Sequence, residues 1–490
     1  MKVKEILNIV GGELLSGSYE MEVGEIKQNS KNIVKGDTFI AIVGENMDGH
    51  KYIQDARKNG ATLAIISNKN SDIEGIDCIL VEDAEKALYD IVEYKISMNN
   101  PVIIGITGSV GKTSTKEILN QILESKFKTF KTPKNFNTKR GIGLALSSYE
   151  DKFEILIAEM GMDSFGEISQ VSTFIKPNIA IITNIGSSHI GNLGNRDNIL
   201  KAKLEILDGL KDNGFLIVNN DSDKLAEYAE KEKQRQCDLD TLQPAENASK
   251  VKKVNIVTFG TKENSDILIK DVIPEEEGTK FTISIDGNES TFFINTFGIH
   301  NIYNIAPAIY IAKIFKMTDE EIQEELKNTK STERRMDKFV TISNMIVYDD
   351  SYNASYESLV AALDTINAKK YYGRKVAVLG DVLELGDFAE EYHRKIGDKL
   401  IDSKYNLVIT AGEMSKFICD EIEKRNNDLS DEEKIKIYHF ENAEEINKNI
   451  DKILRVDDIV LIKASHGMNF KIIADKLREQ EVEPAKYIEE

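Results

Sequence analysis

The sequence predicts an α/β protein built from three domains. Its 490 residues are too many for a single hydrophobic core, because cores stop growing at about 250–300 residues. Apolar strand patterns alternate with amphipathic helical patterns, which is typical of parallel sheets covered by helices on both faces. The alternation restarts near residue 331, which indicates a second large sheet domain after the first.

Residues 1–98 are predicted to form a small N-terminal α/β domain. Two strands are expected at 37–44 and 61–67, with a helical segment at 52–60 between them. Pro101 then opens a different pattern, so the first domain is expected to end at residue 98.

Residues 99–328 are predicted to form the central domain. An apolar strand at 101–108 breaks into a glycine loop, and apolar residues recur at helical spacing over 113–127. Further strands are expected at 153–161, 178–186 and 214–221. The charged, weakly periodic stretch at 229–255 is interpreted as a surface helix and loop.

Residues 329–490 are predicted to form a Rossmann-like C-terminal domain. Its strands are expected at 345–350, 375–381, 406–413 and 458–465, separated by amphipathic helices. Ligands of open α/β sheets bind at the carboxyl ends of the strands, so the chemistry is expected there in both large domains.

The composition excludes several classes of protein. Apolar residues make up 41% and charged residues 30%, an ordinary balance for a soluble globular protein, and the net charge of −20 argues against a nucleic-acid partner. Three distant cysteines, at 78, 237 and 419, fit neither a disulfide framework nor a zinc site. No run reaches the ~18 apolar residues that span a bilayer, and Glu5 interrupts any signal-peptide core. A cytoplasmic location is expected.

The sharpest local motif lies between a predicted strand and helix. It is the short phosphate-loop form G-x-x-G-K-T, with Ile106 where the longer motif has glycine. Glycines let backbone N–H groups converge on phosphate, and the helix N-terminus adds its positive dipole. A glycine turn before a surface helix is the alternative, but strand, loop and helix all favour nucleotide binding. The residues expected to bind ATP are Thr107, Gly108, Ser109, Val110, Gly111, Lys112, Thr113 and Ser114.

Two further strand ends carry residues that suit a Mg²⁺-nucleotide site. Glu159 ends an apolar run, where a carboxylate is costly unless it is paired or bound to a metal. His189 follows the strand at 178–186. A lone histidine there is more often structural, but beside the phosphate loop and Glu159 it is interpreted as a metal ligand.

Nine segments, taken together and in order, resemble the Mur ligases, which build the peptide stem of bacterial peptidoglycan. They read TGSVGKTSTK, AEMGM, TNIGSSHIGNLG, AKLEI, GIHNIYNIA, ERRM, DDSYNAS, LGDVLELG and KASHGM. The similarity runs nearly end to end. It implies an ATP- and Mg²⁺-dependent ligase with an N-terminal UDP-sugar-binding domain, a central ATP-binding domain and a C-terminal ligase domain.

The resemblance also assigns roles to individual residues. It implies that Lys112, Glu159, His189 and Lys203 are catalytic. It also implies that Thr113, Glu159 and His189 bind the metal and that Lys203 is carbamylated to a further oxygen ligand. Lys201, on the same predicted helix, is interpreted as solvated. Asn301 resembles the residue that reads adenine, and Arg335 and Asp350 resemble groups that reach the nucleotide when the domains close; Arg334 is the alternative to Arg335.

Within the family, the segments are most similar to the member that adds D-alanyl-D-alanine to a UDP-N-acetylmuramoyl tripeptide. The D-N-P-R motif of the member that adds lysine or diaminopimelate is absent. There are two departures: Asn29-Ser30-Lys31 stands where the family typically has Asp-Ser-Arg, and His466 stands where it typically has arginine. The residues implied to contact these two substrates are Ser30, Asp48, Gly49, His50, Asn137, Thr138, Asn353 and Ser465.

The implied mechanism runs through an acyl phosphate that the amine of the dipeptide attacks. The rival hypotheses are a folylpolyglutamate synthetase, a non-catalytic nucleotide-binding scaffold and a phosphate-loop kinase. The sequence leaves open whether the tripeptide ends in diaminopimelate or lysine. It also leaves the oligomeric state open, with a monomer as the expectation.

Overall fold

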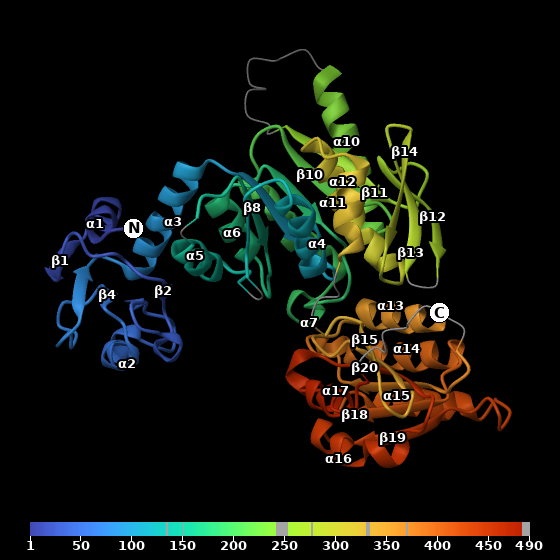
Figure 1. The fold of residues 1–490 in the computed structure, drawn as a ribbon. Coiled ribbons are helices and arrows are strands. Elements are labelled where there is room, and N and C mark those ends of the chain that lie inside the picture. The colour runs from blue at the N-terminus through green and yellow to red at the C-terminus, as the bar shows by residue number, and fades with distance from the viewer. Residues whose placement is uncertain are drawn as a thin grey trace, which may run out of the picture.

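The computed structural model describes residues 1–133, 136–149, 151–241, 253–275, 278–329, 334–368 and 371–482. These residues form three sheets that follow one another along the chain, each packed with helices (Figure 1). The predicted class, α/β with three domains, is therefore confirmed. Within the described ranges, no helix is both long enough and apolar enough to cross a membrane.

The N-terminal sheet has the strand order β1-β5-β4-β3-β2, in which only the β1–β5 pair is antiparallel. The predicted strand at 37–44 is shorter in the structure, because the chain turns back after Ile42, whose carbonyl accepts a hydrogen bond from the Gly49 amide. The elements are α1 (Val3–Val10), β1 (Glu13–Ser16), β2 (Ile26–Lys27), β3 (Thr38–Ile40), α2 (Ile53–Asn59), β4 (Leu63–Ile66), β5 (Asp77–Leu80) and α3 (Ala84–Asn99).

The middle sheet has nine strands in the order β14-β13-β12-β11-β10-β9-β6-β8-β7. The strands from β7 to β12 are parallel, and β12, β13 and β14 pair antiparallel. The strands are β6 (Val102–Thr107), β7 (Thr129–Lys131), β8 (Ile155–Glu159), β9 (Ile179–Ile182), β10 (Gly214–Asn219), β11 (Val254–Gly260), β12 (Ile267–Pro274), β13 (Thr279–Ile285) and β14 (Asn288–Ile294).

Helices cover both faces of the middle sheet. Ile103 of β6 packs on one face and Ile104 on the other, so the strand buries successive side chains and reads as a continuous apolar run. The helices are α4 (Lys112–Glu124), α5 (Lys139–Ser148), α6 (Glu167–Ile175), α7 (Ile190–Leu193), α8 (Arg196–Leu204), α9 (Ile206–Gly209), α10 (Asp223–Thr241), α11 (Ile299–Ile314) and α12 (Asp319–Lys327). The predicted surface helix begins earlier than expected, as α10, and residues 242–252 lie outside the described part.

The C-terminal sheet has six strands in the order β15-β16-β20-β17-β18-β19, and only the β15–β16 pair is antiparallel. The strands are β15 (Asp337–Val340), β16 (Ile346–Asp349), β17 (Lys375–Gly380), β18 (Leu407–Ala411), β19 (Lys436–Phe440) and β20 (Ile459–Lys463). The helices are α13 (Tyr356–Asn367), α14 (Ala389–Asp402), α15 (Lys416–Asn426), α16 (Ala443–Ile453) and α17 (Lys471–Arg478).

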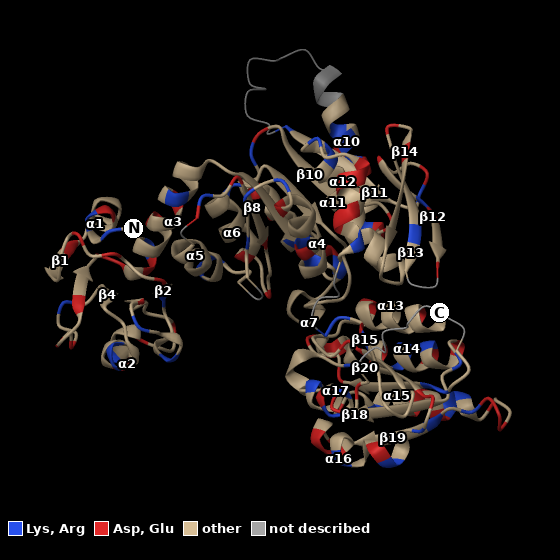
Figure 2. Cartoon of the chain, viewed as in Figure 1, with Lys and Arg blue, Asp and Glu red and all other residues tan. Residues whose placement is uncertain are grey.

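Acidic and basic residues are interspersed in all three domains (Figure 2). The domain boundaries at 98/99 and 328/329 remain a proposal. The first lies between the sheet that ends with β5 and the sheet that begins with β6. The second lies between β14 and β15, next to residues 330–333, which are outside the described part.

Candidate active site

A glycine loop joins β6 to α4, and its backbone is closely packed against neighbouring residues. Gly108 and Gly111 have φ angles of 147° and 89°. A Cβ at Gly108 would lie 1.8 Å from the Thr183 hydroxyl, and one at Gly111 would lie 2.3 Å from the Asn304 side-chain oxygen. Any other residue at these positions would displace the loop, which explains the glycines of the motif.

The loop is fixed against the end of β9. The Val110 amide donates to the Asn184 side chain at 2.9 Å, and the Thr183 hydroxyl donates to the Val110 carbonyl at 2.5 Å. The Ser109 hydroxyl accepts from the Gly186 amide at 2.9 Å. A loop held on both sides in this way is preorganised to present its amides to a phosphate group.

Lys112 begins α4 and folds back over the loop. Its ammonium donates to the Gly108 carbonyl at 2.8 Å. Burial lowers the pKa of Lys112, and Glu159 opposes that shift. The hydrogen bond to Gly108 places the Lys112 ammonium at the point where the loop turns into the helix.

Glu159 lies at the end of β8, only 4% exposed. Its carboxylate accepts from the Thr113 hydroxyl at 2.9 Å and lies 3.6 Å from the Lys116 ammonium. Lys116 also donates to the Thr132 carbonyl at 2.8 Å. The buried carboxylate is therefore paired, as its burial requires.

Thr113 and Glu159 together offer oxygen ligands of the kind that Mg²⁺ prefers. They come from the phosphate loop and from the neighbouring strand end, and their side-chain oxygens are 2.9 Å apart. The residues present therefore fit a magnesium ion bound beside the phosphates of a nucleotide.

His189 precedes α7 and has a left-handed backbone, with φ 64°. Its Nδ1 lies 3.1 Å from an Asp163 carboxylate oxygen and 2.9 Å from a Glu384 carboxylate oxygen. One ligand atom from each of these three residues lies within 4.8 Å of the others. The close approach of His189 lowers the pKa of Glu384.

Lys203 is a buried lysine on α8, 1% exposed. Burial, reinforced by the charge of Lys112, lowers its pKa well below the usual value. No described residue pairs with its ammonium, whereas Lys201 on the same helix is exposed. Such an environment favours a neutral amine.

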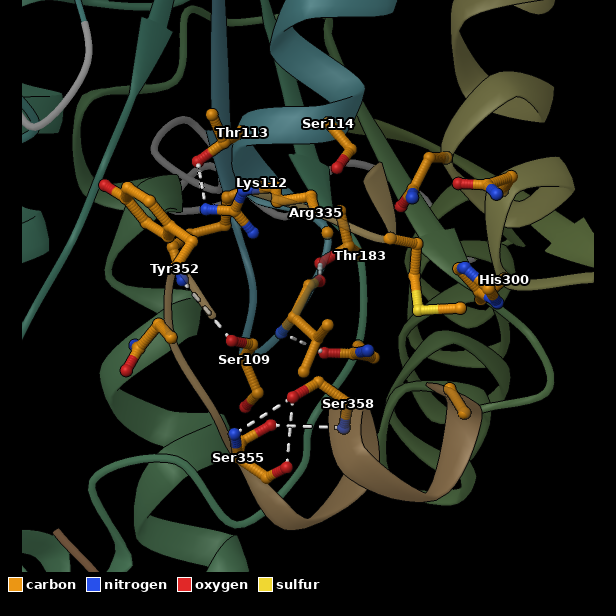
Figure 3. Close-up of a pocket in the computed structure, with 18 of the residues that line it drawn as sticks. Ser109, Lys112, Thr113, Ser114, Thr183, His300, Arg335, Tyr352, Ser355 and Ser358 are labelled. Atoms are coloured by element: carbon orange, nitrogen blue, oxygen red, sulfur yellow. Dashed lines mark hydrogen bonds between the residues drawn. The ribbon is translucent and has the colours of Figure 1, made fainter. Parts of the chain in front are cut away.

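The C-terminal domain contributes Arg335 to this region. Its guanidinium lies 4.4 Å above the Tyr352 ring and donates to the Thr113 hydroxyl at 3.4 Å (Figure 3). Arg334 instead pairs with Asp349 at 3.2 Å and lies away from the loop. The structure thus places Arg335, and not its neighbour, beside the phosphate loop.

Asp350 and Asn353 follow β16 and meet Lys463 from β20. The Lys463 ammonium lies 2.6 Å from the Asp350 carboxylate and donates to the Asn353 carbonyl at 2.9 Å. Asn301, near the start of α11, donates to the Phe297 carbonyl at 2.8 Å. These groups come from two domains and line one cleft.

The cleft has a volume of about 910 Å³ and lies between the middle and C-terminal domains. Thr107, the last residue of β6, and Gly108, the first of the loop, are outside its lining, as is Ser465, whose hydroxyl accepts from the Leu383 amide at 2.9 Å. The predicted site residues that line the cleft are Ser109, Val110, Gly111, Lys112, Thr113, Ser114, Asn137, Thr138, Glu159, His189, Lys203, Asn301, Arg335, Asp350 and Asn353.

The predicted contacts in the N-terminal domain are not part of this cleft. His50 uses both ring nitrogens locally: Nδ1 lies 2.7 Å from the Asp48 carboxylate, and Nε2 accepts from the Ser67 amide at 3.0 Å. Ser30 is buried at the start of a short 3₁₀ turn that the Asn29 side chain caps. The roles of Ser30, Asp48, Gly49 and His50 remain predictions.

Two cleft-facing residues also shape the local backbone. Thr138 caps α5, since its hydroxyl accepts from the Gly141 amide at 3.2 Å. The Asn137 carbonyl accepts from the Gly161 amide at 3.0 Å, next to the end of β8. Asn137 therefore ties the wall of the cleft to the segment after the strand that carries Glu159, and Thr138 fixes the start of α5 beside it.

The middle and C-terminal domains touch directly. The Glu357 carboxylate on α13 accepts from the Ser187 amide at 2.7 Å and from its hydroxyl at 3.0 Å. The Glu384 carbonyl accepts from the Gly191 amide at 2.9 Å. The cleft is therefore closed around residues of both domains.

Sequence reasoning missed five residues around the cleft: Asp163, Glu357, Glu384, Lys116 and Lys463. Lys116 could have been found, because a lysine one turn before Leu119 interrupts the apolar face of α4. Lys463 ends a buried strand, where a charge needs a partner. Glu357 and Glu384 depend on contacts between domains, and Asp163 on a contact between two loops of one domain, which no local pattern indicates.

Comparisons with known proteins cover almost the whole chain. The Mur ligase middle domain matches residues 106–248 and 237–312, the Mur ligase glutamate ligase domain matches 334–466, and the catalytic domain of the Mur ligase family matches 22–126. The UDP-N-acetylmuramoyl-tripeptide--D-alanyl-D-alanine ligase of Bacillus subtilis (strain 168) is 33% identical over 480 residues, covering 97% of this chain and 98% of that protein. The chain belongs to the Mur ligase family.

Solved structures agree with this placement of the Mur ligase. A crystal structure of MurF from Acinetobacter baumannii has a TM-score of 0.81 at 25% identity and covers 98% of each chain. The MurF ligase of Thermotoga maritima, solved in complex with ADP, has a TM-score of 0.76 at 26% identity, over 94% of this chain and 98% of that one. The predicted family is confirmed.

Proposed function

We propose that this Mur ligase joins D-alanyl-D-alanine to a UDP-N-acetylmuramoyl tripeptide at the expense of ATP. The observation that carries the proposal is the single cleft in which the phosphate loop, Glu159, His189 and Lys203 meet residues of the C-terminal domain. The choice of substrates is supported by the end-to-end similarity to the Bacillus subtilis ligase of that name.

ATP binds with its phosphates on the glycine loop. The loop amides and the N-terminus of α4 supply hydrogen-bond donors, and Lys112 and Arg335 supply positive charge from two domains. Asn301 and Asp350 lie further along the cleft and are assigned to the nucleoside. This arrangement neutralises charge on the transferring phosphoryl group, which is the main catalytic demand of phosphoryl transfer.

Thr113, Glu159 and His189 would hold Mg²⁺. When bound, the ion neutralises phosphate charge and orients the phosphoryl group for transfer. Lys116 pairs with Glu159 and keeps its carboxylate at the end of β8, next to Thr113.

Lys203 is assigned to the carbamate that the family resemblance implies. A neutral amine reacts with CO₂ to form a C–N bond and releases a proton, which leaves a carbamate anion in place of the amine. The burial of Lys203, its lowered pKa and the lack of an ionic partner among the described residues all favour this reaction. The anion would offset the positive charge of Lys112 and offer a further oxygen ligand.

The reaction then proceeds in two steps. A carboxylate oxygen of the tripeptide attacks the γ-phosphorus of ATP, the bond to the bridging oxygen breaks, and ADP leaves. The free amine of the dipeptide attacks the carbonyl carbon of the acyl phosphate, the C–O bond to phosphate breaks, and phosphate leaves with the electron pair. The nitrogen loses its proton, and the amide remains.

The tripeptide and the dipeptide are assigned to opposite sides of the cleft. Asn137 and Thr138 face it from the side of the N-terminal domain, where Ser30, Asp48, Gly49 and His50 are proposed to hold the UDP-sugar. Asn353 and Ser465 lie at strand ends of the C-terminal domain and are proposed to receive the dipeptide. Because one chain supplies the whole cleft, a monomer is the proposed active form.

The cytoplasm is the proposed compartment. Cys78 and Cys419 are free and buried, and Cys237 is free and exposed, which suits a reducing environment. Among the described residues, no cysteine belongs to a cluster of metal-ligating side chains.

A test of the function measures phosphate release from ATP with purified protein. Phosphate should appear only when a UDP-N-acetylmuramoyl tripeptide and D-alanyl-D-alanine are both present, and tripeptides ending in diaminopimelate and in lysine are both tried. L-alanyl-L-alanine serves as the matched control acceptor. Hydrolysis at full rate with neither substrate would indicate a simple ATPase, and a stable phosphorylated tripeptide would indicate a kinase.

A further inference from the structure

Two carboxylates from different domains lie close to one nitrogen of His189, Nδ1. Asp163 comes from the same domain as His189, but its side chain is 74% exposed and its oxygen lies 3.1 Å away. Glu384 comes from the C-terminal domain, follows β17, and lies closer, at 2.9 Å. The contact to Glu384 exists only when the two domains are together.

The backbone around Glu384 is fitted to this contact. Its carbonyl accepts from the Gly191 amide at 2.9 Å, so side chain and main chain of one residue both hold α7. A Cβ at Gly191 would lie 2.7 Å from the Gly386 nitrogen, so the two backbones are closely packed. Glu384 also has a left-handed φ of 67°, an unfavourable backbone arrangement for a glutamate that persists where the surroundings enforce it.

The loop that carries Glu384 is anchored within its own domain. The Val382 amide donates to Nε2 of the buried His393 at 3.1 Å, and the Leu383 amide donates to the Ser465 hydroxyl at 2.9 Å. His393 in turn is held by the Ala389 carbonyl, 2.7 Å from its Nδ1. The carboxylate is therefore delivered by a fixed loop, as a positioning group requires.

The contact defines which nitrogen of His189 is available for a ligand. A carboxylate next to Nδ1 favours the proton on that nitrogen, which leaves the lone pair on Nε2. None of the described residues bonds Nε2, and the ring lines the cleft that also contains Lys112 and Glu159. A carboxylate–histidine pair of this kind fixes both the tautomer and the ring orientation of a metal ligand.

We propose that Glu384 is a positioning residue that couples closure of the C-terminal domain to the orientation of His189 as a metal ligand. The inference rests on the proposed function for the role of His189. It implies that the metal site reaches its full affinity only in the closed molecule. ATP bound to the open molecule would then lack a fully formed metal site.

The test uses Mn²⁺ in place of Mg²⁺, bound to the whole protein with a non-hydrolysable ATP analogue. Electron spin echo envelope modulation detects a histidine nitrogen bound to Mn²⁺, and His189→Ala gives the zero reference. In Glu384→Gln, the Mn²⁺ concentration that gives half of the nitrogen signal should rise about tenfold, at the lower end of the effect known for such supporting groups. Thermal melting should be unchanged.

Three further variants make the result specific. Glu390→Gln removes a nearby exposed carboxylate that pairs with Arg394, and it should leave the Mn²⁺ titration unchanged. Asp163→Asn should raise the Mn²⁺ concentration that gives half of the nitrogen signal less than Glu384→Gln does. In the His189→Ala background, Glu384→Gln should not lower total Mn²⁺ affinity further, because the two residues act as one unit.

An unchanged Mn²⁺ titration in Glu384→Gln would overturn the inference, as would a larger effect of Asp163→Asn or an additive loss in the double variant. Absence of the nitrogen signal from the parent protein would also overturn the inference, because His189 would then not bind the metal. The titration needs neither peptide substrate. If the protein fails to release phosphate with both substrates but the Mn²⁺ titration behaves as expected, the proposed function is refuted and the inference about Glu384 stands.

Discussion

Three lysines lie around the phosphate loop, Lys112 half-buried and Lys116 and Lys203 buried, and each has a different environment. Lys112 bonds carbonyls of the loop, Lys116 bonds the Thr132 carbonyl beside the Glu159 carboxylate, and Lys203 has no partner among the described residues. Their chemistry should differ accordingly. Lys112 is suited to neutralise phosphate, Lys116 to hold a carboxylate, and Lys203 to react as a neutral amine.

Lys112→Ala should reduce turnover by about 10²–10³-fold or more, because the variant removes a charge that acts on the transferring phosphoryl group. Steady-state phosphate release measures this effect, and thermal melting should show an intact fold. Lys126→Ala is the control, since Lys126 forms an exposed pair with Glu321 on the same side of the domain. Wild-type turnover in Lys112→Ala would place the nucleotide elsewhere.

Lys203→Ala should lose most activity, because it removes the proposed carbamate. Acetate or formate should restore part of that activity by occupying the vacated space as substitute oxygen ligands. The same anions should not rescue Lys112→Ala, whose missing charge is positive. Rates measured over a series of acetate concentrations test this prediction.

Lys201→Ala is the control for the same helix, because Lys201 is exposed on α8. It should keep wild-type activity. An equal loss in both lysine variants, with no rescue in either, would point to a damaged helix and rule out the carbamate.

At the residue scale, the sequence predicted which side chains surround the cleft better than it predicted their partners. Lys112, Glu159 and His189 were found because each follows a strand or begins a helix. The choice between Arg334 and Arg335 was open, because the two are adjacent and no periodicity separates them. Only the fold shows that Arg334 pairs with Asp349 while Arg335 reaches Thr113.

At the scale of the element, the phosphate loop depends on the absence of a side chain at Gly108. Gly108→Ala should weaken nucleotide binding by at least tenfold, because its Cβ would lie 1.8 Å from the Thr183 hydroxyl that holds the loop. Binding of a fluorescent ATP analogue measures the effect. Gly36→Ala is matched, since Gly36 also has a positive φ, 98°, but nothing lies within 4 Å of its added Cβ. Equal affinities in the two variants would contradict this account of the loop.

The elements differed in how well the sequence predicted them. β6 and β9 bury side chains on both faces, so each is an apolar run that is easy to detect. The β13–β14 hairpin was not predicted from the sequence, because β14 carries polar residues at its start and has one largely exposed face. β2 is only two residues long and has no periodicity to detect.

At the scale of the whole molecule, closure of the C-terminal domain brings the two halves of the cleft together. Glu357 is central to it, since both its carboxylate oxygens accept hydrogen bonds from Ser187 across the interface. Hydrogen bonds to a charged group contribute about 1.5–3 kcal/mol each, so losing the charge should shift the balance toward an open form.

Glu357→Gln should therefore increase the radius of gyration measured by small-angle X-ray scattering and lower turnover about tenfold. Glu391→Gln, on α14 of the same domain, removes only an exposed pair with Lys395 and should change neither quantity. Identical scattering and turnover in Glu357→Gln and the parent protein would show that this contact does not control closure.

The central claim is that the cleft forms an amide through an acyl phosphate. The most direct measurement uses a UDP-N-acetylmuramoyl tripeptide whose reacting carboxylate is labelled with ¹⁸O, incubated with ATP, Mg²⁺, D-alanyl-D-alanine and the purified protein. The account predicts one ¹⁸O atom in each phosphate released, in step with the pentapeptide product, as measured by mass spectrometry. Amide product accompanied by unlabelled phosphate would contradict it, because the carboxylate oxygen would then never have been bonded to phosphorus.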